Sequence, residues 1–169
     1  MEHLEILDKP LIAGLVEFGI VASVQPAFDR LWGGADGMYA QRLGVQRALA
    51  SNPLAALAGV GVPLAFGSDS PVTPLDPWGT VRAAMTHHNP AQRVGFRTAF
   101  AAHTRGGWRA VGNDIEGVLA PNAPATFAVW DCPGVPALVA ADPEEPQPAA
   151  PRCLRTVLRG EVIYDGGGP

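Results

Sequence analysis

The sequence predicts an α/β fold, and three observations carry that prediction. Apolar runs at 20–24 and 62–66 are typical of strands buried in a parallel sheet, and each follows a predicted helix. The 20 Gly and 17 Pro residues among 169 divide the chain into short elements, which argues against a simple helical bundle. With 47% hydrophobic and 17% charged residues, the composition is that of a globular protein and excludes a disordered or fibrous chain.

The first half of the chain alternates predicted helices and strands. Pro10 is tolerated in the first turn of a helix, and Gly19 suits the end of one. The β-branched run after Gly19 stops at Pro26 and reads as a strand, and the glycines at 33–37 predict a loop. We therefore expect a helix between Asp8 and Gly19, a strand over Ile20–Val24, helices over Met38–Leu49 and Pro53–Val60, and a strand over Val62–Phe66.

The second half changes in character after residue 114. Asp76-Pro77-Trp78 opens a helix that runs to about His87, because Asp favours the N-cap and Pro the first helical position. A further helix is expected over Arg97–Val111. Strands follow at Thr126–Trp130 and Leu154–Tyr164, separated by a Pro-rich connector, Pro133–Pro151, that we interpret as an exposed loop. The predicted units are therefore 1–114 and 115–169.

Charge and hydropathy narrow the possible partners. The net charge is -4, and the 12 Lys and Arg residues are scattered, so the sequence predicts no binding to nucleic acid or anionic lipid. No apolar run reaches the roughly 18 residues of a membrane span, and the first residues lack the pattern of a signal peptide. We expect no membrane association, a cytoplasmic location, and free thiols at Cys132 and Cys153.

Asp69 is the strongest candidate for a functional residue. Its carboxylate follows a buried strand directly, and the carboxyl ends of strands carry the sites of α/β enzymes. It is therefore a candidate metal ligand and general base. The alternative is that Asp69 or Ser70 only caps the turn before Pro71. His3 is the second candidate, with an exposed terminal histidine as its alternative.

Other polar motifs favour structural roles. His87 and His88 point to different faces of a helix, so we expect surface roles or contacts with a helix C-terminus rather than joint chelation of one ion. His103 lies in an Ala-rich apolar segment and is expected to be a core or interface residue. Gly106-Gly107 lacks the Lys and Ser/Thr of a phosphate-binding loop, and the segment around Ser68 has Pro where a nucleophile elbow needs Gly.

Five short motifs together resemble the C-terminal part of the metal-dependent amidohydrolases, and in particular the YtcJ-like branch that hydrolyses N-substituted amides. The resemblance covers nearly the whole chain. In chain order, the motifs are Glu2-His3, Ser23-Val24-Gln25-Pro26, Gly67-Ser68-Asp69-Ser70-Pro71, Asp76-Pro77-Trp78 and Thr104-Arg105-Gly106-Gly107.

The resemblance implies a fold and a site. The family has a (β/α)₈ barrel, and this chain resembles its last two to three strands with their helices, followed by the C-terminal strands of a small composite β domain. His3 is similar to the sixth-strand histidine ligand and Asp69 to the eighth-strand aspartate. The implied cofactor is a divalent metal, with zinc expected, and the implied substrate is a small-molecule amide whose C–N bond is hydrolysed by metal-activated water.

The chain also departs from the family pattern. It has no His-x-His pair and no candidates for the ligands of the fourth and fifth strands. One hypothesis is that the chain is an amidohydrolase despite these departures. A second hypothesis is an inactive remnant, or a half-barrel that self-associates or needs a complementing N-terminal half. The reason is that exposed edges of parallel strands carry unpaired backbone groups that can pair with another chain. A third is a stand-alone module that binds a ligand near Asp69.

Overall fold

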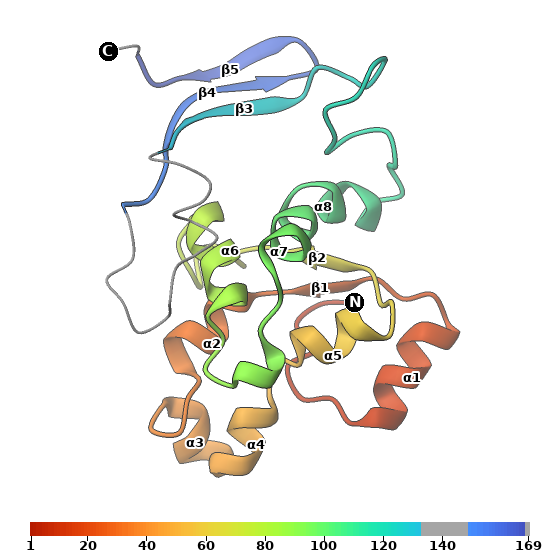
Figure 1. The fold of residues 1–169 in the computed structure, drawn as a ribbon, viewed down its shortest axis with the longest axis vertical. Coiled ribbons are helices and arrows are strands. Elements are labelled where there is room, and N and C mark those ends of the chain that lie inside the picture. The colour runs from red at the N-terminus through yellow and green to blue at the C-terminus, as the bar shows by residue number, and fades with distance from the viewer. Residues whose placement is uncertain (133–148, 168–169) are drawn as a thin grey trace.

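The computed structural model describes residues 1–132 and 149–167, which form an α/β unit with an antiparallel sheet beyond it (Figure 1). Among these residues, no helix is long and apolar enough to cross a membrane. The elements are α1 Lys9–Glu17, β1 Ala22–Val24, α2 Pro26–Trp32, α3 Met38–Leu43, α4 Val45–Ala50, α5 Leu54–Gly59, β2 Leu64–Phe66, α6 Pro77–Met85, the 3-10 turn η1 Pro90–Gln92, α7 Phe96–His103, α8 Arg105–Ala110, β3 Phe127–Asp131, β4 Arg152–Leu158 and β5 Glu161–Asp165.

The α/β unit is built on a parallel sheet. Strands β1 and β2 pair in parallel, with Val24 opposite Phe66. The first residues of the chain extend this sheet on the other side of β1, because Glu2 forms a parallel bridge with Ser23 and the His3 N–H donates to the Ser23 carbonyl at 2.8 Å. Strand β1 therefore lies between the His3 segment and β2, which agrees with the resemblance of His3 to a sixth-strand ligand and of Asp69 to an eighth-strand ligand. The carboxyl ends of these three parallel segments lie at the same side of the sheet.

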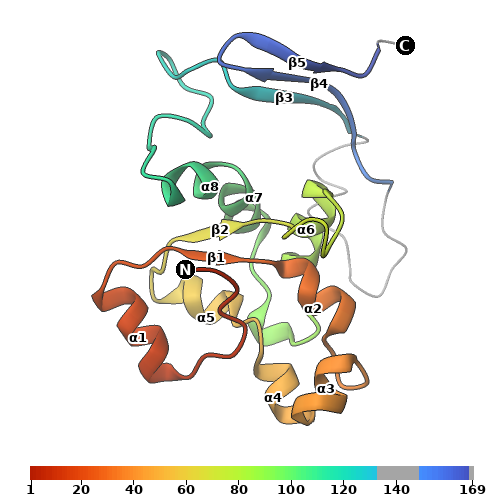
Figure 2. The same cartoon turned by 180° about the vertical axis from the view of Figure 1, so that it is seen from behind.

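The core lies between this sheet and the helices around it (Figure 2). Side chains alternate along a strand, so Ala22 and Val24 share one face of β1 while Ser23 lies on the other. The buried cluster draws on both strands and on helices α1, α5, α6 and α7. Its members are Leu15, Ala22, Val24, Leu54, Leu57, Val62, Leu64, Phe66, Val81, Ala84, Val94, Ala99 and Ala102.

Two of the motifs shared with the amidohydrolases support the fold. Asp76 caps α6, since its carboxylate accepts a hydrogen bond of 2.8 Å from the Gly79 N–H. Gly106 lets α8 approach β2: a Cβ there would lie 2.2 Å from the Leu64 carbonyl oxygen. These motifs fix the positions of α6 and α8.

The antiparallel sheet has the strand order β3-β4-β5. Strands β4 and β5 form a tight hairpin whose two central residues, Arg159 and Gly160, both have positive φ angles, 50° and 87°. The Arg159 guanidinium donates from Nε and Nη2 to Oε1 of the buried Glu116, at 2.9 and 2.6 Å. These hydrogen bonds lower the pKa of Glu116 and tie the hairpin to the segment after α8.

Three predicted elements differ in the structure. The helix expected over Met38–Leu49 is two helices, because Gly44 has a φ of 81°. The helix over Arg97–Val111 breaks at Thr104, which lies outside helical geometry. The strand over Leu154–Tyr164 is the β4–β5 hairpin.

Helix α2 was not predicted. Most of the Pro133–Pro151 connector lies outside the described residues, so its interpretation as an exposed loop stays a prediction, as does the division at residue 114.

Candidate functional site

Asp69 lies in the loop that follows β2 and is exposed. Other groups hold this turn: the Ser68 hydroxyl accepts from the Ser70 N–H at 3.2 Å, and the Thr73 hydroxyl donates to the Ser68 carbonyl. The Asp69 carbonyl accepts from the Val72 N–H, but among the described residues none donates to its carboxylate. Its φ of 54° is left-handed, a conformation that costs of order 1–3 kcal/mol and concentrates at functional sites.

His3 is held by a chain of polar contacts. Its Nδ1 lies 3.0 Å from Oε1 of the buried Gln25, and the Gln25 Nε2 donates to the Glu2 carboxylate at 3.3 Å. The Phe28 ring stacks on the imidazole with centroids 6.0 Å apart. His3 also has a left-handed backbone, with a φ of 68°. The imidazole is therefore exposed, as in the alternative that the sequence left open, but it is anchored through Nδ1.

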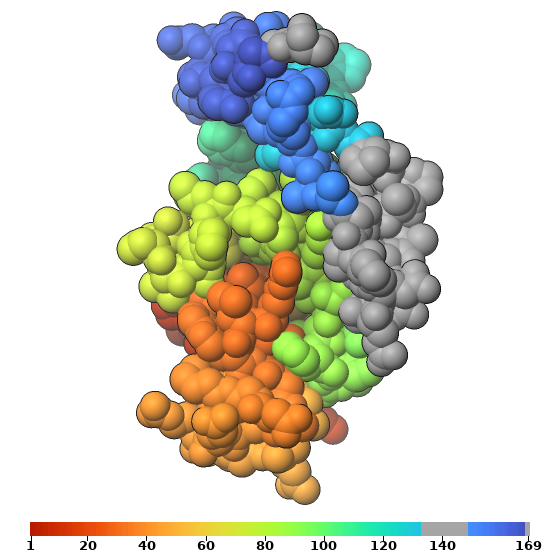
Figure 3. Space-filling view, turned by 90° about the vertical axis from the view of Figure 1, so that its left-hand side faces the viewer, coloured from red at the N-terminus to blue at the C-terminus, as the bar shows by residue number. Residues whose placement is uncertain are grey.

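The segments that follow β1 and β2 lie side by side. Helix α2 packs on α6, and Figure 3 shows the surface where residues after β2 (yellow-green) meet α2 (orange). At this edge Asp69 follows β2, and His3 follows Glu2, the residue that forms the isolated parallel bridge with Ser23. The sheet register thus brings both candidates to one end of the α/β unit.

These donors fit part of a divalent-metal site. An imidazole nitrogen and a carboxylate oxygen are ligand types that zinc accepts, and a structural or catalytic zinc needs three or four protein ligands. Across residues 1–132 and 149–167, no three or more His, Cys, Asp and Glu side chains are grouped to hold a metal ion. Further ligands would have to come from outside these residues.

A buried polar cluster joins α2 to the turn after α6. Asp29 accepts from the His88 N–H at 2.9 Å and from the His88 Nδ1 at 3.1 Å, while Nε2 of His87 lies 3.4 Å from the other carboxylate oxygen. The Asn89 N–H donates to Nδ1 of His87, so the proton of the neutral ring is on Nε2, facing Asp29. A Cβ on Gly33 would lie 2.3 Å from the Asp29 carboxylate, which accounts for one glycine of the predicted loop.

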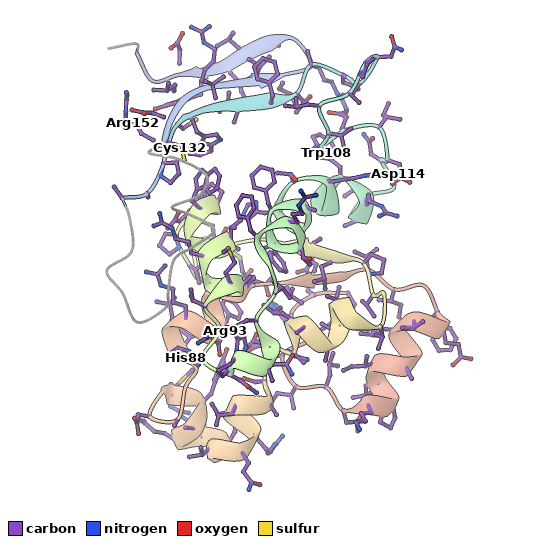
Figure 4. All side chains as sticks on the ribbon, in the orientation of Figure 1. His88, Arg93, Trp108, Asp114, Cys132 and Arg152 are labelled. Atoms are coloured by element: carbon purple, nitrogen blue, oxygen red, sulfur yellow. The ribbon has the colours of Figure 1, made fainter. Side chains whose placement is uncertain are left out.

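For the two histidines the sequence predicted surface roles or contacts with a helix C-terminus, and the surface role is wrong for His87, which is only 1% exposed. Tertiary packing of α2 against α6 buries it. His88 is more open, and Figure 4 shows it beside α2 near Arg93, whose Nε donates to the His87 carbonyl at 2.9 Å.

We expect acid to destabilise the fold through His87. Burial lowers its pKa below the ordinary 6.5, so below that pH the unfolded chain takes up a proton that the folded chain does not. The free energy of unfolding should therefore fall as the pH drops from about 7.5 to 5.5, by up to about 1.4 kcal/mol per pH unit for this residue. His87→Gln should flatten this slope in urea denaturation, whereas Arg47→Gln on the exposed face of α4 should not. An unchanged slope in His87→Gln would contradict the prediction.

A cavity of about 990 Å³ lies between α6, α7, α8 and the β3-β4-β5 sheet. Its lining includes the aromatic rings of Trp78, Phe100 and Trp108, and Figure 4 shows Trp108 between α8 and the sheet. His103 lines it too, and burial lowers the pKa of this imidazole, in keeping with the expected interface role. Asp69 lines neither this cavity nor a smaller one of about 230 Å³, so neither is the pocket that a binding module using Asp69 would need.

Sequence reasoning missed two polar residues near the candidate site. Gln25 directly follows β1, so the argument that singled out Asp69 after β2 applies to it as well. Asp29 carries no comparable signal, because an acidic residue in the first turn of a helix is ordinary. Only the packing of α2 on α6 shows that it is buried.

The fold is an α/β unit with polar loops at the carboxyl ends of its parallel strands. The model of the Amidohydrolase family matches residues 1–164, and the chain belongs to that family. This confirms the resemblance at the level of the superfamily.

The chain matches only a part of each curated relative. The chain is 32% identical over 146 residues to Protein LONG AFTER FAR-RED 3 of Arabidopsis thaliana, covering 78% of this chain and 24% of that protein. It is 32% identical over 131 residues to an imidazolonepropionase of Cereibacter sphaeroides, covering 77% of this chain and 29% of that protein. The chain thus spans less than a third of the length of these relatives.

Solved structures share the fold. An uncharacterised metal-dependent hydrolase from Pyrococcus furiosus is 28% identical, with a TM-score of 0.62 over 70% of this chain and 25% of that one. The atrazine chlorohydrolase of Arthrobacter aurescens, solved with zinc, is 19% identical, with a TM-score of 0.68 over 97% of this chain and 35% of that one. The second likeness shows the fold alone, and it includes the antiparallel sheet.

Proposed function

We propose that this chain is the part of a metal-dependent amidohydrolase that supplies His3 and Asp69 to a site for hydrolysing the C–N bond of a small-molecule amide. The observation that carries the proposal is the placement of both residues, each on a left-handed backbone, at one edge of the parallel sheet. Membership of the amidohydrolase family supports it, as do relatives described as metal-dependent hydrolases.

The proposal includes a place in the barrel. Strands β1 and β2 would be the last two strands of a (β/α)₈ barrel, and residues 1–3 the end of the strand before them. Residues 115–169 would be the C-terminal strands of the small β domain. The YtcJ-like branch and a cytoplasmic location belong to the same proposal.

The two residues have different roles in this scheme. A divalent metal, with zinc expected, supplies Lewis-acid polarisation and an activated water when bound. His3 offers Nε2 as a ligand, since Nδ1 is engaged by Gln25. Asp69 accepts the proton of the attacking water on a carboxylate oxygen and delivers it to the amide nitrogen as the C–N bond breaks. The exposure of its carboxylate suits this exchange of a proton.

A half-barrel that needs a complementing chain is the second candidate. It is favoured by the small number of ligands that the described residues bring together and by a parallel sheet of two strands and one bridge. Barrels close by pairing every strand, so the outer edges of this sheet offer unpaired backbone groups to a partner.

Because the described residues bring together too few ligands, the purified chain is expected to show no metal-dependent amidase activity by itself. The measurement is turnover of a panel of N-acyl amines and cyclic amides with added zinc or manganese. Turnover well above a metal-only blank, lost in Asp69→Asn, would contradict the expectation and show that this chain alone builds the site.

The purified chain is also expected to self-associate. Strand β2 is apolar and buried, and the outer edges of the parallel sheet lack neighbouring strands in the described residues. Light scattering across a concentration series should give a mass that rises with concentration. A compact, monodisperse monomer at every concentration would overturn this prediction, and a mass held at that of one defined oligomer would favour a closed assembly over open aggregation.

A further inference from the structure

Gln25 stands out because it is almost fully buried at the end of β1 and touches both polar side chains of the first segment, Glu2 and His3. A buried amide needs partners for both its ends, and this one has them on either side. The proposed chemistry gives Gln25 no step, since an amide neither binds a proton at neutral pH nor acts as a nucleophile.

The order of the three side chains determines which end of the amide faces which neighbour. A carboxylate only accepts hydrogen bonds, so Glu2 selects the NH₂ end of Gln25, 3.3 Å away. The amide oxygen is then left facing His3, and it too only accepts. The ring nitrogen that faces it at 3.0 Å, Nδ1, must therefore carry the proton of the neutral imidazole.

This protonation leaves the lone pair on the other ring nitrogen, Nε2. Neutral histidine offers only one nitrogen with a lone pair, and the hydrogen bond of the other nitrogen decides which one it is. Phe28 stacks on the ring, so its plane is held as well as its tautomer. The arrangement prepares His3 to bind through Nε2 before any ligand arrives.

We propose that Gln25 is a positioning residue that fixes His3 in the Nδ1–H tautomer and aims Nε2 at a divalent metal ion, with Glu2 holding the amide in the required orientation. The proposal rests on the assignment of His3 as a ligand under the proposed function. It adds a residue that acts through His3 and does not touch substrate or metal.

The tautomer is tested without metal by ¹⁵N NMR of the histidine rings at about pH 8.5, roughly two units above the ordinary histidine pKa of about 6.5. A His3→Phe variant assigns the His3 signals. In the unaltered chain, Nδ1 should give a protonated-type shift and Nε2 an unprotonated-type shift. Gln25→Leu should move both signals toward the opposite tautomer, and Gln25→Glu, which keeps an acceptor facing Nδ1, should restore the original pattern.

Two further variants keep the test decisive. Glu2→Leu changes only an exposed side chain and should let the side-chain amide of Gln25 flip by 180°, which gives a mixture of His3 tautomers. This variant keeps the test available even if Gln25→Leu fails to fold. Gln46→Leu on the exposed face of α4 is the matched control and should change nothing.

A second readout is the zinc affinity of the complex of this chain with a complementing chain, measured by competition with a coloured chelator. Gln25→Leu should weaken binding about 10- to 100-fold, as the loss of a ligand's hydrogen-bond partner does elsewhere. His3→Phe should weaken it at least as much.

His3 signals that stay the same in Gln25→Leu and Glu2→Leu, or an unaltered chain with the proton on Nε2, would overturn the proposal while leaving the amidohydrolase assignment standing. The opposite outcome is also distinguishable. If the His3 tautomer depends on Gln25 but the complex with a complementing chain never hydrolyses amides, the positioning role of Gln25 stands and the proposed function fails.

Discussion

The Asp69→Asn substitution is expected to lower amide turnover about 10²- to 10⁴-fold once this chain is complemented by a second chain that carries the other strands of an amidohydrolase barrel. The neutral amide of Asn cannot take the proton of the attacking water, although it has nearly the same size and tolerates the left-handed backbone at this position. Co-expression of the two chains, followed by assay of the purified complex with zinc, measures the effect.

The control for this experiment is Asp36→Asn, which makes the same change at an exposed carboxylate in the loop after α2 and should leave turnover unchanged. If Asp69→Asn and Asp69→Ala both keep the turnover and zinc affinity of the unaltered complex, Asp69 is only a turn residue. If the complementing chain binds and no amide is hydrolysed by any pairing, the half-barrel hypothesis fails as an account of activity.

The Leu57→Ala substitution is expected to reduce the free energy of unfolding by about 2–5 kcal/mol. Leu57 in α5 is completely buried, in the cluster that joins the helices to β1 and β2. Truncating it removes apolar contacts and leaves a cavity that the surrounding helices fill only in part. Because domains of this size are stable by about 5–15 kcal/mol, one substitution would remove a large share of the total. Urea denaturation followed by tryptophan fluorescence measures the change.

Leu31→Ala is the matched control, since Leu31 is 54% exposed on α2 and loses the same atoms. We expect a change of about 0.5 kcal/mol or less there. Equal effects at the two positions would mean that α5 does not pack on the sheet as described.

The local sequence was sufficient for elements with strong end signals. Asp8 and Asp76 cap helices that begin as predicted, because a capping carboxylate followed by proline restricts the chain within a few residues. The apolar runs ending at Val24 and Phe66 became strands for a similar reason: their β-branched and aromatic side chains suit a buried sheet.

Breaks within predicted elements were harder to foresee. Gly44 divides one predicted helix through its positive φ, and Arg159 takes up a left-handed conformation that its side chain does not favour. At Arg159 the turn is held from a distance, since Glu116 binds the guanidinium across 43 positions of sequence. A local sequence pattern gives no information about such a long-range contact.

The sequence by itself determined the family, the parallel strands and the choice of Asp69 and His3, because each depends on residue types in short, ordered motifs. Only the tertiary structure decided that His3 is held through Nδ1, that no described residue donates to the Asp69 carboxylate, and that His87 is buried against Asp29. The physical reason is that hydrogen bonds and burial join residues from different elements, such as Gln25 with His3 and α2 with α6. Tertiary packing, and not the neighbouring residues in the chain, determines which of these elements come into contact.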